Sequence, residues 1–278
     1  MTPPPTSDSP PRRAAKALAA IRRAAAVVRD DAIGLVPPGF SPDAWLRLVR
    51  LPNLLTVPGD VLAGFLLAPA ASASDWGQLL FLAIPAGLLL YSAGLVLNDL
   101  FGYAEDLLER PQRPLPAKQV SRESAAAVAI SLLWIAAFAA AFFDALPVAL
   151  PLVLCIVLYD VGLKRVPFLG PLLMGACRAG NLLLGVSAAH EGLAPAPVAG
   201  AAVLGLYVAA VSHLARNEAK PGAKISPRHV GFLLRMLIPL QAALCLAAFH
   251  RFPLNLLGLA LLPLLPLHRR LSQKYPPS

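Results

Sequence analysis

Four carboxylates lie close together after a long apolar run: Asp99, Glu105, Asp106 and Glu109. If the run continues as a helix, each residue turns by about 100°, so Asn98, Asp99, Glu105 and Asp106 share roughly a third of its circumference. Like charges so placed repel each other unless a cation joins them. Carboxylate and amide oxygens suit Mg²⁺, which commonly shares its coordination shell with substrate phosphates. The geometry alone leaves two interpretations open, a metal site and a solvated acidic helix end.

A second group of polar residues lies inside an apolar segment. Arg178 and Asn181 are three residues apart in the apolar run 167–188, so they share one helix face. An ionisable group inside a membrane span is costly and is a functional candidate. The alternative is a hydrogen-bonded strut between helices. We expect Arg178 to face a central cavity.

The elements that must position these residues are apolar throughout. Hydrophobic residues make up 57% of the chain and charged residues 14%, whereas roughly a quarter of the residues of a soluble domain are charged. Backbone groups in lipid must pair internally, and continuous apolar runs indicate helices rather than a barrel. The sequence therefore predicts an all-α, polytopic membrane bundle. The predicted spans are 46–70, 78–98, 124–143, 145–160, 167–188, 195–215, 229–249 and 252–268.

The formal net charge of +9 is distributed unevenly among the loops. With the N-terminus inside, nearly all Lys and Arg side chains fall in cytoplasmic segments, and the opposite loops hold only Arg251. This placement explains the basic balance without a nucleic-acid partner. It predicts a multi-pass protein of the cell (inner) membrane, with the N-terminus and the active-site loops cytoplasmic.

Three regions follow from this organisation. Residues 1–42 are predicted to form a cytoplasmic extension, first Pro-rich and disordered, then a basic helix lying on the membrane surface. Residues 43–271 form the transmembrane domain, and 272–278 form a cytoplasmic tail.

The acidic stretch also resembles a known family. "NDLFGYAED…RPQRPLPAKQVS" resembles the first aspartate motif of the UbiA superfamily of intramembrane prenyltransferases, N-D-x-x-D-x-x-x-D followed by R-P-[IL]-P. "LYDVGLKRVPFLG" resembles the family's lysine-bearing loop, and the resemblance covers residues 44–270. It implies about eight to nine transmembrane helices around a central cavity open to membrane lipids. It also implies a polyprenyl diphosphate substrate, an Mg²⁺ cofactor and transfer of the prenyl group to an unidentified small-molecule acceptor.

The resemblance assigns roles by position. Asn98, Asp99 and Asp106 match the motif, but Gly102 stands where the family has its middle Asp, and Glu105 is the residue that could replace it. These four residues, Asn98, Asp99, Glu105 and Asp106, are the predicted catalytic set. The second motif should fall in "VSHLARNEAKPGAK", where Glu218 matches its last Asp. The predicted metal ligands are therefore Asn98, Asp99, Asp106 and Glu218. "SHLARNE" and "CRAGNLLLG" resemble the EboC-like branch.

Six further polar residues are predicted to contact the diphosphate. In the transition state negative charge develops on the leaving diphosphate, and basic donors stabilise it. An apolar cavity would protect the allylic cation from water. The predicted diphosphate-binding residues are Asn53, Arg113, Lys164, Arg178, Asn181 and Arg216.

A function without catalysis is the alternative. Because the aspartate motifs are degenerate, the chain could bind or transport a prenyl lipid without turning it over. A transporter more typically has internal repeats and polar groups at mid-membrane. Here the polar residues gather toward one side of the membrane, which favours a site for a lipid diphosphate.

Overall fold

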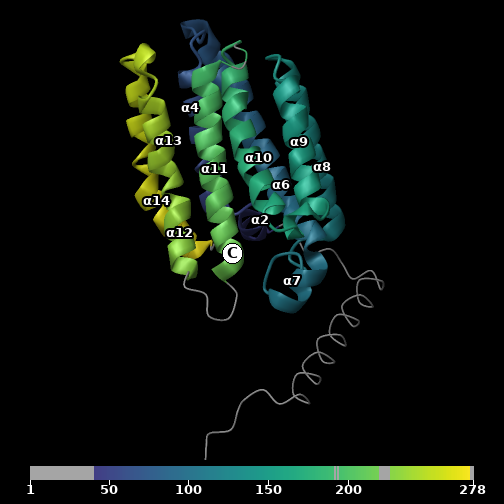
Figure 1. The fold of residues 1–278 in the computed structure, drawn as a ribbon. Helices are drawn as coiled ribbons and strands as arrows, with labels where there is room; N and C mark the ends of the chain where they lie inside the picture. The colour runs from purple at the N-terminus through teal and green to yellow at the C-terminus, as the bar shows by residue number, and fades with distance from the viewer. Residues whose placement is uncertain (1–40, 191, 193, 219–225, 276–278) are drawn as a thin grey trace, which may run out of the picture.

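The computed structural model describes residues 41–190, 192, 194–218 and 226–275, and all of its regular secondary structure is helical (Figure 1). The predicted all-α architecture is therefore confirmed. The predicted extension lies almost entirely outside the described residues. The main helices are α2 (Pro42–Leu48), α3 (Leu51–Leu54), α4 (Val57–Leu67), α6 (Ile84–Phe101), α7 (Tyr103–Glu109), α8 (Arg122–Ala141), α9 (Leu146–Val161), α10 (Leu169–Ser187), α11 (Pro195–Glu218), α12 (Pro227–Arg235), α13 (Leu237–Leu246) and α14 (Leu264–Lys274).

Seven apolar helical segments are candidates for contact with the membrane interior. Five described helices are long enough to cross it: Ala73–Phe101, Arg122–Ala141, Leu169–Ser187, Pro195–Arg216 and Arg228–Leu246. Two further apolar helices, Leu51–Leu67 and Leu146–Val161, are shorter. The chain is thus a multi-pass membrane protein.

Two predicted spans are broken into shorter pieces. The run 46–70 forms α2, α3 and α4, and a proline stands in the first turn of each helix. Proline lacks the backbone N–H that a helix interior uses and suits the first turn, so each of these prolines marks the start of a helix. The last run forms a 3-10 helix, η5 (Leu254–Leu261), followed by α14.

The helices stand side by side as a bundle (Figure 1), and α10 packs against α4, α9 and α11. Glycines allow the approach of α4 to α10. A Cβ at Gly185 would collide with the carbonyl oxygen of Val61, and one at Gly64 with that of Leu182. The outer surface is apolar: the side chains of Phe81, Trp134 and Phe138 are largely exposed, as expected of a face in contact with lipid.

Candidate active site

The acidic stretch lies at a one-residue break between α6 and α7. Gly102 ends α6 with φ −87° and ψ −1°. Its N–H donates to the Asn98 carbonyl at 3.0 Å, and its own carbonyl accepts from the Asp106 N–H at 2.9 Å. The helical turn therefore continues across the break, and both Asp99 and Asp106 are buried.

Asp99 and Asp106 converge on one arginine. Nη1 of Arg113 lies 2.7 Å from Oδ2 of Asp106 and 3.4 Å from Oδ1 of Asp99. Arg50 Nη2 donates to the same Asp99 oxygen at 3.1 Å. Arg113 comes from the Pro-rich loop after α7, and this loop places it against the two aspartates.

Glu105 belongs to the predicted arc of Asn98, Asp99, Glu105 and Asp106, but its side chain does not join the buried cluster. Its side chain is 54% exposed, and its nearest cation is Arg165, with Nη2 at 3.7 Å from Oε2. Glu109 is also exposed. The physical reason is helix geometry: Glu105 precedes Asp106 by one residue, which is about 100° around the axis, and the buried face is centred on Asp99 and Asp106.

Lys164 joins this cluster from the turn after α9. Its Nζ donates to the Asn98 side-chain oxygen at 2.7 Å and to the Asn98 carbonyl at 3.2 Å. It lies 3.8 Å from Oδ1 of Asp160, a buried carboxylate oxygen without a hydrogen-bond partner in the described part of the chain. Burial, partly offset by the Asp160 carboxylate, lowers the pKa of Lys164.

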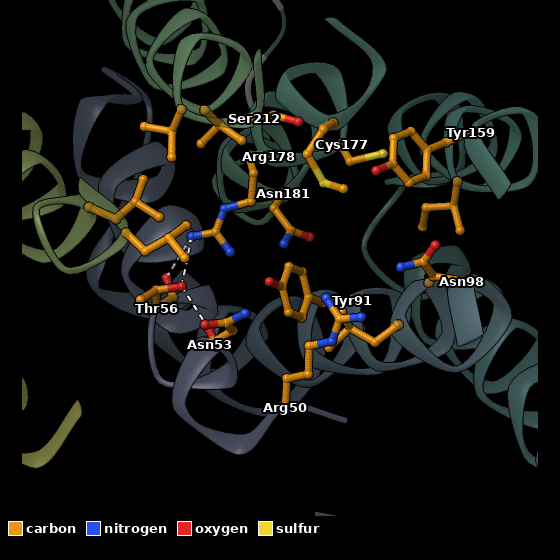
Figure 2. A pocket seen from close by; sticks show the side chains of 18 of the residues that line it. Arg50, Asn53, Thr56, Tyr91, Asn98, Tyr159, Cys177, Arg178, Asn181 and Ser212 are labelled. Atoms are coloured by element: carbon orange, nitrogen blue, oxygen red, sulfur yellow. Dashed lines mark hydrogen bonds between the residues drawn. The ribbon is translucent and has the colours of Figure 1, made fainter. Parts of the chain in front are cut away.

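A cavity of about 460 Å³ extends from this cluster into the bundle. Figure 2 shows Asn98 and Tyr159 toward one side of it and Arg178, Asn181 and Thr56 toward the other. Much of the wall between them is apolar and includes Leu90, Leu152, Ile156 and Val208. The cavity thus joins two polar centres through an apolar space.

The inner polar centre is a network across three helices. Asp60 on α4 is fully buried, and its carboxylate faces Arg178 on α10 with Nε 2.9 Å from Oδ2 and Nη2 3.0 Å from Oδ1. Gln241 on α13 donates to the same Oδ1 at 2.5 Å and to the Thr56 carbonyl at 2.6 Å. The buried charge of Arg178 is therefore paired.

Two atoms of this centre keep unused hydrogen-bonding capacity. Nη1 of Arg178 and Oδ1 of Asn181 are buried and have no hydrogen-bond partner among the described residues. Both side chains line the cavity, as Figure 2 shows. A buried unpaired donor is costly unless a water or ligand satisfies it.

The other predicted diphosphate contacts take different positions. Asn53 lines the cavity. Arg216 is exposed and holds the turn that carries Lys164: its Nη1 and Nη2 donate to the carbonyls of Val166 and Arg165, both at 2.9 Å. It therefore braces the turn rather than lining the cavity. The Glu218 side chain lies outside what the structure describes.

The donor set at the outer cluster fits a hard cation. Oxygens of Asp99 and Asp106 already converge on a single positive nitrogen, and the Asn98 side-chain oxygen faces another. Among the described residues, no three His, Cys, Asp or Glu side chains gather as a metal site. Mg²⁺ usually needs only one or two carboxylates and completes its shell with water and substrate phosphate. The cluster thus suits a cation bound together with a phosphate.

Two residues of the site were missed in the sequence. Arg50 was read only as a flanking positive charge, although it contacts Asp99 and lines the cavity. Asp60 was not singled out, although a carboxylate inside the run 46–70 is the expected counter-ion for an arginine in another span.

Fold and site together define an intramembrane helical bundle with a charged cluster at the mouth of an apolar cavity. The chain belongs to the UbiA prenyltransferase family, whose pattern matches residues 60–276.

Relatives in this family share a common name. The digeranylgeranylglyceryl phosphate synthase of Methanoculleus marisnigri is 32% identical over 208 residues, which is 69% of this chain and 70% of the relative. That of Methanoregula boonei is 38% identical, but over 40% of this chain and 39% of its own length. That of Saccharolobus solfataricus is 28% identical over about half of each chain. These names do not support the predicted placement in the EboC-like branch.

Solved structures have the same fold. A structure of a UbiA homolog from Archaeoglobus fulgidus bound to GPP and Mg²⁺ matches 83% of this chain and 87% of its own, with a TM-score of 0.51 and 17% identity. A structure of the same homolog with Cd²⁺ matches with a TM-score of 0.50 and 16% identity. At these identities the likeness establishes the fold.

Proposed function

We propose that this protein is an intramembrane prenyltransferase that moves a prenyl group from a prenyl diphosphate to a lipid acceptor. The observation that carries the proposal is the position of the cluster formed by Asp99, Asp106, Arg113 and Lys164 beside an apolar cavity of about 460 Å³. A diphosphate needs the first feature, and its prenyl tail needs the second.

The outer cluster would hold the diphosphate. Asn98, Asp99 and Asp106, joined by Glu218 of the second motif, would bind Mg²⁺, which supplies positive charge for the leaving diphosphate. The Asp99 and Asp106 oxygens that Arg113 contacts would be among those that hold the ion. Arg50, Arg113 and Lys164 would then turn their N–H groups to the diphosphate oxygens.

The cavity would protect the reacting carbon. When the allylic C–O bond breaks, the diphosphate leaves with the bonding electrons, and the prenyl carbon carries positive charge. The apolar wall formed by Leu90, Leu152 and Ile156 limits the access of water to that carbon. An acceptor hydroxyl would then form the new C–O bond and release its proton. The Oδ1 of Asp160 would accept this proton: Asp160 lines the cavity, and this buried oxygen has no hydrogen-bond partner in the described part of the chain.

The inner polar centre would position the acceptor rather than the diphosphate. Because Asp60 already balances its charge, Arg178 offers Nη1 to a neutral oxygen more readily than to a diphosphate. The relatives' name describes a product with two geranylgeranyl chains on glyceryl phosphate. We therefore propose a glyceryl phosphate lipid as the acceptor, with a glyceryl oxygen on Arg178 Nη1 and Asn181.

The membrane and its orientation belong to the same proposal. The distribution of Lys and Arg supports a cell-membrane protein whose outer cluster faces the cytoplasm.

The full chain, purified and reconstituted in lipid nanodiscs, tests this function. Geranylgeranyl diphosphate and geranylgeranylglyceryl phosphate are supplied with Mg²⁺, and the doubly prenylated product is measured by mass spectrometry. We expect product formation that EDTA abolishes and excess Mg²⁺ restores. Transfer to another acceptor in place of this lipid would overturn the acceptor assignment. Tight binding of geranylgeranyl diphosphate without transfer to any acceptor would favour a non-catalytic lipid-binding protein.

A further inference from the structure

A second groove lies on the other side of α12 from the cavity. It has a volume of about 690 Å³ and runs between α12 and α14. Three arginines line it, Arg228 and Arg235 from α12 and Arg269 from α14, together with the apolar side chains of Phe232 and Leu265. The proposed prenyl transfer uses none of these residues.

The described residues do not neutralise the positive charge of this groove. None of the three arginines has an ion-pair partner in the part of the chain that the structure describes. The sequence contains no Asp or Glu after Glu218, so α12, α13 and α14 supply no carboxylate. Arg228 and Arg235 are seven residues apart, which places them on one face of α12, opposite Arg269. Like charges gathered in one groove favour the binding of an anion.

The rest of the groove is apolar and partly exposed. Phe232 is 51% exposed and lies between the two arginines of α12, and Leu265 faces it from α14. An inorganic anion would leave these side chains in contact with water. An anion that carries hydrocarbon chains would cover them, and burial of apolar surface is favourable.

The position of the groove in the bundle identifies the source of such an anion. Figure 1 shows α12 and α14 reaching toward the end of the bundle at which α7 lies. α12 opens the apolar segment Arg228–Leu246, so Arg228 stands where a membrane span begins. Basic pockets between membrane helices at this depth meet lipid head groups.

We propose that this groove binds an anionic glycerophospholipid. The phosphate would accept hydrogen bonds from Arg228, Arg235 and Arg269, and one acyl chain would lie along Phe232. A lipid held there packs against α12, whose Gly231 also lines the cavity. The other residues that line the groove do not line the cavity, so the groove is a lipid site separate from the proposed sites for the diphosphate and the acceptor.

Native mass spectrometry of the full-length protein in detergent tests the proposal. Phosphatidylglycerol and phosphatidylcholine with the same acyl chains are titrated in parallel, and the bound lipid is counted. We expect phosphatidylglycerol to bind at least about tenfold more tightly, because each charge-assisted hydrogen bond to phosphate is strong. Arg235→Gln should remove most of this preference, and Arg235→Lys, which keeps the charge but not the planar fork, should retain part of it.

Arg270 provides a matched control. It is adjacent to Arg269 on α14, is equally charged and exposed, and does not line the groove. Arg269→Gln should weaken phosphatidylglycerol binding about tenfold and Arg270→Gln less than about twofold, because solvent and salt screen an exposed charge that does not contact the lipid. Equal losses in the two variants would show non-specific attraction and overturn the site.

Two further outcomes also decide against the proposal. Equal affinity of the unmodified protein for the two lipids would refute the proposed lipid site. Displacement of phosphatidylglycerol by an equal concentration of inorganic phosphate would show a simple anion site. Thermal unfolding of each variant without added lipid identifies variants that fail to fold; if Arg235→Gln is one of them, the comparison of Arg228→Gln with Arg270→Gln takes its place.

Discussion

Replacement of two adjacent carboxylates on α7 should have very different effects. Asp106→Asn should lower the rate of prenyl transfer by 10²-fold or more, because it removes an oxygen charge from the cluster that would hold the metal and the leaving diphosphate. Glu105→Gln, one residue earlier, should leave the rate almost unchanged. The family pattern alone suggests the opposite for Glu105, since Gly102 leaves a carboxylate position to be filled.

The magnitudes follow from burial and partners. The Asp106 side chain is 7% exposed and lies 2.7 Å from Nη1 of Arg113. Glu105 is 54% exposed, and its pair with Arg165 spans 3.7 Å. Exposed ion pairs contribute on the order of 0–1 kcal/mol. Even if all of that were lost from the transition state, the rate would fall by no more than about fivefold.

The assay is steady-state release of diphosphate from geranylgeranyl diphosphate by the reconstituted protein, with Mg²⁺ varied. Glu109→Gln serves as a matched control, because Glu109 is also an exposed carboxylate on α7. Asp106→Asn should in addition raise the Mg²⁺ concentration needed for half-maximal rate, which a purely structural defect would not do. A loss in Glu105→Gln as large as that in Asp106→Asn would refute the reasoning and restore Glu105 as the substitute for the missing Asp.

Three further perturbations test other parts of the molecule. Burial lowers the pKa of Lys164, so this side chain should lose its proton, and the binding of prenyl diphosphate should weaken, at a pH below the roughly 10.4 of a free lysine. A fluorescence titration of binding across pH checks this. Lys164→Arg should make binding less dependent on pH. Gly185→Ala should destabilise the bundle by about 1–3 kcal/mol, since its Cβ would collide with a carbonyl oxygen of α4, while Gly77→Ala, with open space around it, should leave thermal unfolding unchanged. Arg178→Gln should lower the free energy of unfolding by about 3–5 kcal/mol, because it leaves Asp60 unpaired. The double variant Arg178→Gln with Asp60→Asn should unfold at a temperature closer to that of the wild type but should still transfer no prenyl group to the acceptor.

The sequence could predict those features that depend on local periodicity. Apolar runs without alternation identified the helices, and the turn of about 100° per residue brought Asp99 and Asp106 to one face. The same rule did not show which part of the arc would be buried, so Glu105 was grouped with them. That choice depends on the loop after α7, which brings Arg113 Nη1 to 2.7 Å from Oδ2 of Asp106.

Local periodicity could not predict which side chains of distant helices pair with each other. Arg178 was identified as a costly charge inside a span. Its counter-ion Asp60 lies 118 residues away along the chain, and Gln241, which donates to Asp60, lies 63 residues away; the three become neighbours only when α4, α10 and α13 pack together. Arg50 was missed for a related reason. Its left-handed backbone, φ 48° and ψ 61°, separates α2 from α3 at a point where the apolar pattern predicted one continuous span. Sequence thus locates a buried charge more readily than it locates its partner.

The glycine at position 102 fits the structure in a way that the family pattern does not suggest. A Cβ there would approach the Asn98 carbonyl oxygen to 2.9 Å and would stand 3.8 Å from both Nζ of Lys164 and Oδ2 of Asp106. A carboxylate at this position would therefore compete with Asn98 for Lys164 and would add a third negative charge beside Asp99 and Asp106. Without it, Lys164 donates to the neutral amide of Asn98, and its ion pair with Asp160 is long at 3.8 Å, so a diphosphate can take the ammonium group at lower cost than from a close ion pair. The loss of a metal ligand at position 102 thus accompanies a Lys164 side chain that is more readily available to the diphosphate, and both features act on the binding of the same diphosphate.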